Sequence, residues 1–314
     1  MARMKAAICP RYGPPEVFRF LDVEKPQPKP DQVRIKVHAS AVTDSDIFIR
    51  SSKVSLRYMI PMRLMMGITR PRRAIIGEVL AGEVESVGQN IQRFKVGDPV
   101  YGITGFDLGA YAQYTCMKET DSTHGCLAKK PGNLGYEQAT AAAYGGLLAL
   151  QYMEKGDIRS GQQVLIYGAS GTTGTIAVQF AKHLGAEVTA VCGPAHLQMV
   201  KELGADRAWD YTAMDTVEDA MRFDLVLDAV GPTKSSLLKT ACKEALTPHG
   251  IYSSIGDGNL KPDSRRLEQL NGLIEAGHIK PVLDRIYPFE QLIEAHRYVE
   301  QGHKTGGVAI TIGH

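Results

Sequence analysis

Six consecutive residues near the middle of the chain have the spacing of a phosphate-binding turn. The segment Ala169–Gly174 follows the apolar run Gln163–Tyr167 and precedes a helix-like run, Thr175–Leu184, and a second apolar run, Glu187–Cys192. Small residues between strand and helix let backbone N–H groups approach a pyrophosphate, and the helix N-terminus adds unpaired donors and the positive end of a dipole. We therefore predict dinucleotide contacts at Ala169, Ser170, Gly171, Thr172, Thr173 and Gly174. The alternative is an ordinary turn of small residues.

The elements around this turn have two different periodicities. From Gln163 onward strand-like and helix-like runs alternate, which is the pattern of an α/β, doubly wound parallel sheet. The first third is β-rich: in Val33–Ala39 apolar residues alternate with polar ones, as in a half-exposed antiparallel strand. Between the two parts, Tyr136–Met153 is predicted to be a helix whose small residues at 141–146 permit close backbone approach.

Composition excludes several classes of protein. The chain has 314 residues, enough for two compact domains, and a net charge of only +2, which gives no electrostatic reason for binding nucleic acid or an acidic membrane. Its five cysteines have no paired spacing, so no disulfide framework is expected. The beginning of the sequence lacks an apolar signal core, and no apolar run reaches the ~20 residues of a membrane span. We expect a cytoplasmic protein.

The chain resembles the quinone oxidoreductase branch of the medium-chain dehydrogenase/reductase superfamily over nearly its whole length. The resemblance rests on the glycine turn and on the segments AGEVESVG, FKVGDPVYG, YGGLLAL and FDLVLDAVG. It implies a barrel-like, GroES-like catalytic domain over residues 1–127 and an NADP-binding Rossmann domain over 128–260. Residues 261–314 are then expected to return to the catalytic domain.

The end of the second strand bears on the choice of nucleotide. NAD-preferring sites place Asp or Glu there to bind the ribose hydroxyls, whereas this chain has Cys192 and Gly193. With the nearby cations His196 and Lys201, and Tyr211 by resemblance, this favours NADPH over NADH. For His196 an exposed loop histidine is an equal alternative. Further cofactor contacts are expected at Val230, Gly231, Ile255 and Gly256.

The residues at the metal positions of zinc-dependent relatives are different here. Those relatives carry Cys-His where this chain has Thr43-Asp44, and His-Glu where it has Glu78-Val79. Carboxylates without thiolate or imidazole make a poor zinc site, so we predict no zinc and no other metal. Glu78 is then a polar group at the edge of the cleft.

A zinc-independent, NADPH-dependent reductase of quinones or α,β-unsaturated carbonyls fits these features, because such substrates take up hydride without a metal-bound alkoxide. By resemblance Tyr144, Thr43 and Asp46 lie at the substrate and nicotinamide. Tyr144 would donate a hydrogen bond to the carbonyl; alternatively it is a core tyrosine. Asp46 could instead be a structural carboxylate that holds its loop.

Three departures from the family pattern keep other functions open. Leu148 and Gly307 replace a threonine and a Lys or Asn that are common in relatives, and the connection 257–266 is short. They motivate an NADPH-binding sensor or partner protein with little turnover as one alternative; a zinc-free alcohol dehydrogenase is another. The short connection also predicts a monomer or a non-standard dimer. The methionine-rich run Tyr58–Gly67 could form an adaptable lip over the substrate, or it could pack in the hydrophobic core.

Overall fold

The computed structural model describes residues 2–52, 63–64, 66–233, 235–258 and 260–314. Most of the methionine-rich run, and with it the predicted lip, lies outside the described residues. The chain divides into two compact units: unit 1 comprises residues 1–143, 262–268 and 283–314, and unit 2 comprises 144–261 and 269–282. No helix within the described ranges is long and apolar enough to cross a membrane.

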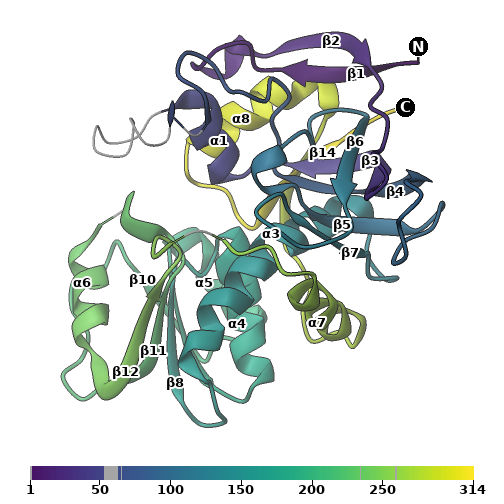
Figure 1. Ribbon diagram of the computed structural model, residues 1–314. Helices are drawn as coiled ribbons and strands as arrows, with labels where there is room; N and C mark the ends of the chain where they lie inside the picture. Colours follow the sequence, from purple (N-terminus) through teal and green to yellow (C-terminus); the bar gives the residue numbers. More distant parts are fainter. Residues whose placement is uncertain (1, 53–62, 65, 234, 259) are drawn as a thin grey trace. The chain divides into compact units, whose positions relative to one another are not determined.

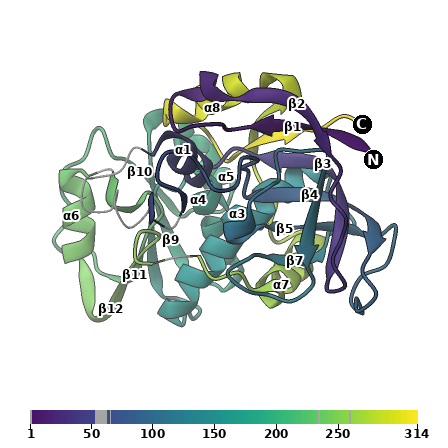
Figure 2. The ribbon, with the colours of Figure 1, turned by 45° about the horizontal axis from the view of Figure 1, so that its top comes forward.

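Unit 1 is built on a seven-stranded sheet and a separate hairpin. The sheet runs in the order β13-β14-β3-β4-β5-β7, with β6 also paired to β3. Strands β1 and β2 pair in the hairpin, which is labelled in Figure 2. The strands are β1 (Arg3–Ile8), β2 (Arg19–Glu24), β3 (Gln32–Ala41), β4 (Val79–Val87), β5 (Pro99–Ile103), β6 (Tyr114–Lys118), β7 (Cys126–Lys129), β13 (Leu283–Pro288) and β14 (Gly307–Thr311). In β3 the predicted alternation is confirmed, because Val33, Ile35 and Val37 are buried and the residues between them are partly exposed.

Two helices of unit 1 are joined through a buried arginine. Helix α1 (Asp44–Ser51) contacts helix α8 (Leu292–Glu300). Arg50 is fully buried; its guanidinium donates to the Glu300 carboxylate and to the Gly13 carbonyl, and its Nε lies 3.3 Å from Nδ1 of His296. Burial, and then the Arg50 charge, hold the pKa of His296 well below its usual value of 6.5, so that ring is neutral. The pairing of Arg50 with Glu300 compensates a charge that would otherwise be costly to bury.

Unit 2 is a parallel sheet in the order β10-β9-β8-β11-β12. Its strands are β8 (Gln163–Tyr167), β9 (Glu187–Cys192), β10 (Arg207–Asp210), β11 (Phe223–Asp228) and β12 (Leu246–Ser254). Helices α4 (Thr172–His183) and α5 (Leu197–Glu202) lie on one side of the sheet and α6 (Leu237–Glu244) on the other (Figure 1). The predicted α/β doubly wound sheet is therefore confirmed, in the order of the first five strands of a dinucleotide-binding fold.

The sheet of unit 2 ends at β12 among the described residues, where the usual order continues to a sixth strand. Only residues 255–263 separate β12 from helix α7 (Ser264–Glu275), so the short connection noted in the sequence leaves β12 as an edge strand. Pro248, which has no N–H to donate, lies within this strand.

The borders of the units differ from the expected domains at two helices. Helix α3 (Tyr136–Met153) runs across the border at 143/144, so unit 1 extends beyond residue 127. The C-terminal part of α7 belongs to unit 2, although all of 261–314 was expected in the catalytic domain. Packing explains this, because a Cβ on Gly146 of α3 would lie 2.2 Å from Cδ2 of Leu270 in α7.

Candidate functional site

The predicted glycine turn is a tight strand-to-helix connection in unit 2. Gly168 has φ = 84°, a conformation that favours glycine, and the N–H groups of Gly168 and Ala169 both donate to the Val191 carbonyl of β9. Gly171 is the N-cap of α4 and has no side chain to cap it, so the start of the helix is open to an external acceptor. A Cβ on Gly174 would lie 2.2 Å from the Gly168 carbonyl oxygen. Gly174 is therefore needed for the close packing of helix and turn.

The other expected cofactor residues follow the carboxyl ends of the neighbouring strands. In the parallel register, Tyr167 of β8 pairs with Val191 and with Asp228, and Asp228 pairs with Ser254. These strands therefore end at one edge of the sheet, where dinucleotides bind in this class of fold. Cys192 is the last residue of β9, and the expected residues that follow the strand ends are Gly193, Val230, Gly231, Ile255 and Gly256.

A buried carboxylate that was not predicted holds two of these loops. Asp228, at the end of β11, is 2% exposed; its Oδ1 accepts the N–H groups of Val230 and Gly231 at 3.1 Å each. Its Oδ2 accepts the hydroxyls of Tyr252 and Ser254 and lies 2.8 Å from Nζ of Lys239. Asp228 belongs to the segment FDLVLDAVG, so its position at a strand end was the available signal.

The end of β9 carries both expected and unexpected neighbours. Tyr211 is 43% exposed, and its ring would lie 3.6 Å from a Cβ on Gly193. His196 is the N-cap of α5, whereas the exposed Lys201 lies in the last turn of this helix, about 7 Å farther along the axis. Asp210 of β10 pairs with Cys192 in the register, so a carboxylate does lie beside this strand end. Its Oδ1 accepts from the backbone and hydroxyl of Thr212.

Tyr144 lies on α3 beside a close backbone contact with the glycine turn. A Cβ on Gly145 would come within 2.6 Å of the carbonyl oxygen of Thr172, so α3 meets the first residue of α4 at this point. Every residue from Ala139 to Leu150 is buried except Tyr144, which is partly exposed. Tyr144 is thus less buried than its neighbours on this helix.

Thr43 and Asp46 meet in unit 1, where they cap α1. The Asp46 carboxylate accepts the backbone N–H and the hydroxyl of Thr43 at 2.9 and 2.7 Å, while the Thr43 hydroxyl accepts from the backbone of Asp46. Asp46 also accepts the Glu78 N–H at 3.1 Å and contacts the Tyr111 hydroxyl. Burial raises the pKa of Asp46 to about 6, against hydrogen bonds that lower it. This geometry makes Asp46 a carboxylate that fixes its loop.

Glu78 lies next to Asp46, and its carboxyl group has fewer hydrogen-bond partners than that of Asp46. Its backbone carbonyl accepts from the N–H and the hydroxyl of Thr104, and the Ser45 side chain bonds its carboxyl group. Its Oε2 is buried without a hydrogen-bond partner. Burial, and then the Asp46 charge, raise the pKa of Glu78 to about 8.

These groups do not fit zinc. The side chains that gather here offer carboxylates and hydroxyls, and both oxygens of Asp46 are already used as acceptors. No group of three His, Cys, Asp or Glu side chains that could hold a metal ion occurs in the part of the chain that the structure describes. Zinc in a catalytic site usually has thiolate or imidazole ligands, which are missing from this cluster.

The departures at Leu148 and Gly307 have packing explanations. Leu148 is 5% exposed, so its side chain belongs to the packed interior. A Cβ on Gly307 would lie 2.7 Å from Cβ of Ala141, so β14 approaches α3 too closely for a Lys or Asn side chain at this position.

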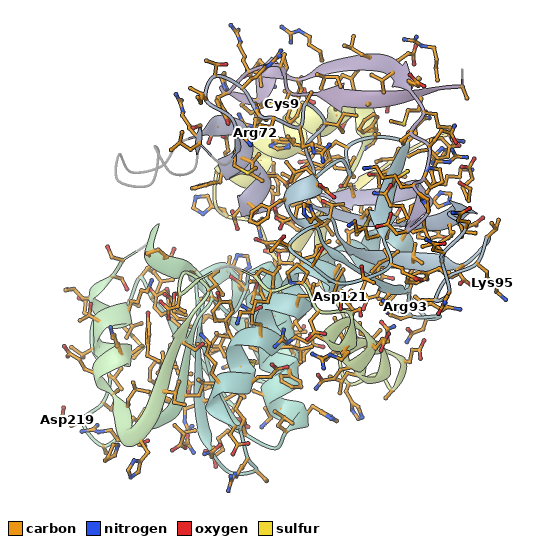
Figure 3. All side chains as sticks on the ribbon, viewed as in Figure 1. Cys9, Arg72, Arg93, Lys95, Asp121 and Asp219 are labelled. Carbon is orange, nitrogen blue, oxygen red and sulfur yellow. The ribbon has the colours of Figure 1, made fainter. Side chains whose placement is uncertain are left out.

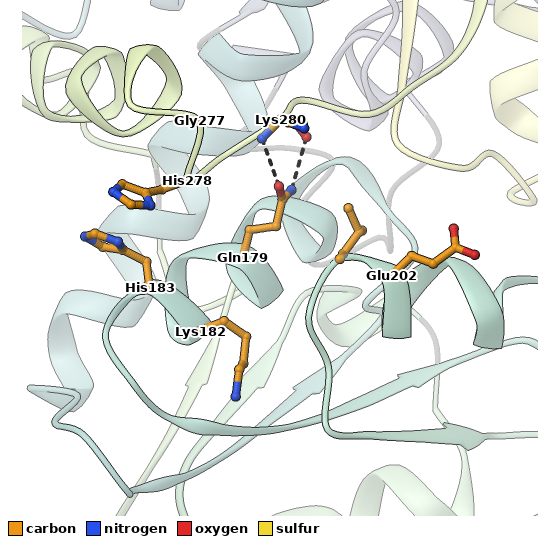
Figure 4. Close-up of a pocket in the computed structure, with 8 residues that line it drawn as sticks. Gln179, Lys182, His183, Glu202, Gly277, His278 and Lys280 are labelled. Atoms are coloured by element: carbon orange, nitrogen blue, oxygen red, sulfur yellow. Dashed lines mark hydrogen bonds between the residues drawn. The ribbon is translucent and has the colours of Figure 1, made fainter.

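Two surface cavities lie away from the residues described so far. One, of about 430 Å³, is lined by Gln179, Lys182, His183, His278 and others, and Gln179 bonds both backbone groups of Lys280 there (Figure 4). It lies at the C-terminal end of α4, about 18 Å of helix from the turn. The other, of about 600 Å³, lies in unit 1 and is lined by residues that include Cys9 and Arg72, both labelled in Figure 3.

The contact between Gly174 and Gly168 generates a prediction. We expect Gly174→Ala to weaken the binding of NADPH and NADH by about tenfold or more, because overpacking against backbone costs about 1–3 kcal/mol. Fluorescence titration of each nucleotide measures this. Gly272→Ala in α7 is the matched control, since a Cβ there would contact nothing within 4 Å. Unchanged affinity in Gly174→Ala would contradict the proposed packing.

Comparison with known proteins extends these observations over the whole chain. Residues 29–145 match the alcohol dehydrogenase GroES-like domain, and residues 172–271 and 258–310 match two families described as zinc-binding dehydrogenase. The 2-methylene-furan-3-one reductase of Solanum lycopersicum is 31% identical, over 98% of this chain and 79% of its own. The chloroplastic NADPH-dependent alkenal/one oxidoreductase of Arabidopsis thaliana is 30% identical, with the same coverages.

A solved structure agrees with these relatives. The quinone oxidoreductase from Coxiella burnetii superposes with a TM-score of 0.81 at 25% identity, and the match covers 99% of this chain and 100% of the other. Together with the parallel sheet, the glycine turn and the GroES-like match, these similarities confirm the resemblance found in the sequence. The chain belongs to the medium-chain dehydrogenase/reductase superfamily, in its quinone oxidoreductase-like branch.

Proposed function

We propose that this protein is an NADPH-dependent reductase of quinones or α,β-unsaturated carbonyls. The observation that carries the proposal is the open start of α4 after a turn that only small residues can form. Relatives named as an alkenal/one oxidoreductase, a 2-methylene-furan-3-one reductase and a quinone oxidoreductase support the substrate class. The substrate is a small molecule with an electron-poor carbonyl.

The residues of unit 2 would hold the nucleotide, whose reduced nicotinamide supplies hydride when bound. Backbone groups of the turn 169–174 would bind the pyrophosphate, while Asp228 fixes the loops at Val230 and Ile255 that border it. His196 and Tyr211 at the end of β9 would contact the adenosine phosphate, with Lys201 farther from it. Asp210 accepts from Thr212, which partly offsets its repulsion of a 2′-phosphate.

A screen of electron-poor carbonyls tests the function. We expect steady oxidation of NADPH in the presence of a quinone or an enone, and tighter binding of NADPH than of NADH. Absorbance of the reduced nicotinamide follows turnover, and titration gives the two affinities. Binding without turnover on any such substrate would favour the sensor alternative, and a preference for NADH would contradict the cofactor assignment.

Tyr144 is the proposed hydrogen-bond donor to the substrate carbonyl, because it is partly exposed at the point where α3 contacts Thr172. We expect Tyr144→Phe to lower kcat by about 10²–10³-fold if it is the main donor to the developing negative charge, with NADPH affinity nearly unchanged. Steady-state kinetics and nucleotide titration separate the two effects. Unchanged kcat would assign Tyr144 to packing and make Thr43 the next candidate.

Zinc independence is part of the proposal. The cluster of Thr43, Asp46 and Glu78 offers oxygen atoms only, a poor donor set for zinc. We expect turnover of a quinone or enone to survive exhaustive chelation, with elemental analysis of the protein as the accompanying measurement. Stoichiometric zinc whose removal abolishes turnover would overturn this part of the proposal.

A monomer, or a dimer that does not extend the sheet, is the proposed assembly. The edge strand β12 contains Pro248, and the segment after it carries Lys261, Pro262, Arg265 and Arg266, which are features that discourage pairing. Light scattering at micromolar concentration gives the mass, and a dimer with one sheet continued through β12 of both copies would contradict this proposal.

The expected cytoplasmic location stays a prediction, because the relatives include chloroplastic and mitochondrial proteins.

A further inference from the structure

Lys239 of helix α6 is a largely buried cation that the proposed function has not used. Its ammonium group lies 2.8 Å from Oδ2 of Asp228 and donates to the Gly231 carbonyl at 2.6 Å. The side chain of Lys239 is 13% exposed and that of Asp228 is 2% exposed, so water screens this ion pair only weakly. The lysine therefore connects the loop after β11 to the carboxylate at the end of that strand.

Asp228 extends this connection to a second loop. Its Oδ1 accepts the N–H groups of Val230 and Gly231, which hold the loop after β11. Its Oδ2 accepts the Ser254 hydroxyl at 3.0 Å, and the oxygen of that hydroxyl accepts the Gly256 N–H at 3.2 Å. One carboxylate thus fixes the loops after β11 and β12.

The start of α6 is joined to a third strand end. Ser236 is the N-cap of α6, and its side chain accepts the Lys239 N–H at 3.0 Å. The hydroxyl groups of Ser236 and Tyr167 share a hydrogen bond of 2.7 Å. Tyr167 ends β8 directly before the glycine turn, and its carbonyl accepts the Ala229 N–H at 2.8 Å. The network therefore reaches the ends of β8, β11 and β12, all within unit 2.

These three strand ends lie at one edge of the sheet, where dinucleotides bind in this class of fold. We propose that Lys239 is a positioning residue for NADPH, which acts through Asp228 to hold the loops after β11 and β12 in the arrangement that the nucleotide requires. This inference rests on the proposed function, and the role requires no contact between Lys239 and the nucleotide. Loops that are already ordered favour binding, because the nucleotide does not have to order them.

The charge of the lysine is the property that matters for this role. Removal of one partner from a buried ion pair leaves the other charge uncompensated, which is strongly unfavourable. Without Lys239, the cost of burying the Asp228 carboxylate is relieved when it takes up a proton or when its surroundings open to water. Either change alters the hydrogen bonds that Asp228 makes to the two loops.

Substitution of Lys239 tests the role through nucleotide affinity, which requires no turnover. We expect Lys239→Met to weaken NADPH binding by about tenfold or more in fluorescence titration, because the lysine and Asp228 belong to one network. Lys239→Arg keeps the positive charge and has donors for both Asp228 and the Gly231 carbonyl, so it should bind NADPH nearly as well as the wild type. Wild-type affinity in Lys239→Met, or equal losses in the two variants, would overturn the proposal.

Lys182 provides a matched control for the loss of an ion pair elsewhere in unit 2. Its ammonium group, drawn in Figure 4, also has one acidic partner and one carbonyl, Asp206 at 2.8 Å and Ala186 at 2.9 Å. Asp206 accepts the N–H of Val188 near the start of β9, so this pair lies at the opposite edge of the sheet. Lys182→Met should keep the wild-type affinity for NADPH, even where thermal unfolding shows lower stability. A loss of affinity equal to that of the other methionine variant would overturn the proposal.

A double variant tests whether the lysine acts through Asp228. Asp228→Asn removes the negative charge but keeps an oxygen acceptor on the side chain. We expect Lys239→Met to weaken NADPH binding much less in this background than in the wild type, because no buried carboxylate is then left unpaired. Equal losses in the two backgrounds would show that the lysine acts independently of Asp228 and would overturn the proposal.

Kinetics with NADPH and an enone separate positioning from chemistry. We expect Lys239→Met to raise KM for NADPH and to leave kcat at saturating NADPH nearly unchanged, because the network holds the nucleotide loops rather than the reacting atoms. A lowered kcat with unchanged KM for NADPH would overturn the proposal. If the wild-type protein binds neither NADPH nor NADH, the cofactor assignment fails and this inference fails with it. If it binds NADPH but reduces no enone or quinone, the proposed reductase activity fails, whereas the affinities still decide the role of Lys239.

Discussion

The close approach of three backbone segments at the start of α4 is the constraint on which the proposed cofactor site depends. Gly174 lies against the Gly168 carbonyl, and Gly145 of α3 lies against Thr172. A side chain at either glycine would push the helix start away from the strand end that supplies the turn. Because Gly171 at the N-cap has no side chain to cap the helix, the backbone donors at the start of α4 can serve a phosphate group. Tyr144 acquires its position from the same contact, being the residue before Gly145.

Three buried carboxyl groups show how hydrogen bonding decides the role of an acid. Asp228 has backbone donors, two hydroxyls and Lys239 around it, and it fixes two loops of unit 2. Asp46 has backbone and hydroxyl donors without a cation, and it fixes the start of α1. Glu78 has only the Ser45 side chain on its carboxyl group, beside the charge of Asp46. The pKa of Glu78 is accordingly raised to about 8, whereas that of Asp46 is raised only to about 6.

Local patterns in the sequence predicted much of this fold, and non-local pairings account for the remainder. Strands β8 and β9 and helix α3 have the predicted bounds, because buried parallel strands form continuous apolar runs and the long helix is rich in small and apolar residues. The start of β12 could not be predicted in the same way, since Pro248 and Gly250 interrupt its pattern. Strand β2, almost wholly exposed, has no alternation from which it could be predicted.

The candidate site also combines residues that a local pattern identifies with residues that only the fold brings together. The glycine turn is a local signature, so its residues could be named from the sequence. The pairing of Asp210 with Cys192 depends on strand register, and the contact of Glu78 with Asp46 joins residues 32 positions apart, so neither could be derived from spacing. The family pattern shows Gly307 only as a departure from the usual Lys or Asn. The structure explains it by packing, because Gly307 lies close to Ala141.

Transfer of a labelled hydride tests the central claim most directly. With NADPH carrying deuterium at C4 of the nicotinamide and an enone as substrate, the account predicts a saturated carbonyl product with deuterium on the β-carbon. Nuclear magnetic resonance of the product locates the label. Deuterium on the carbonyl carbon, with formation of an allylic alcohol, would instead reveal an alcohol dehydrogenase and contradict the account.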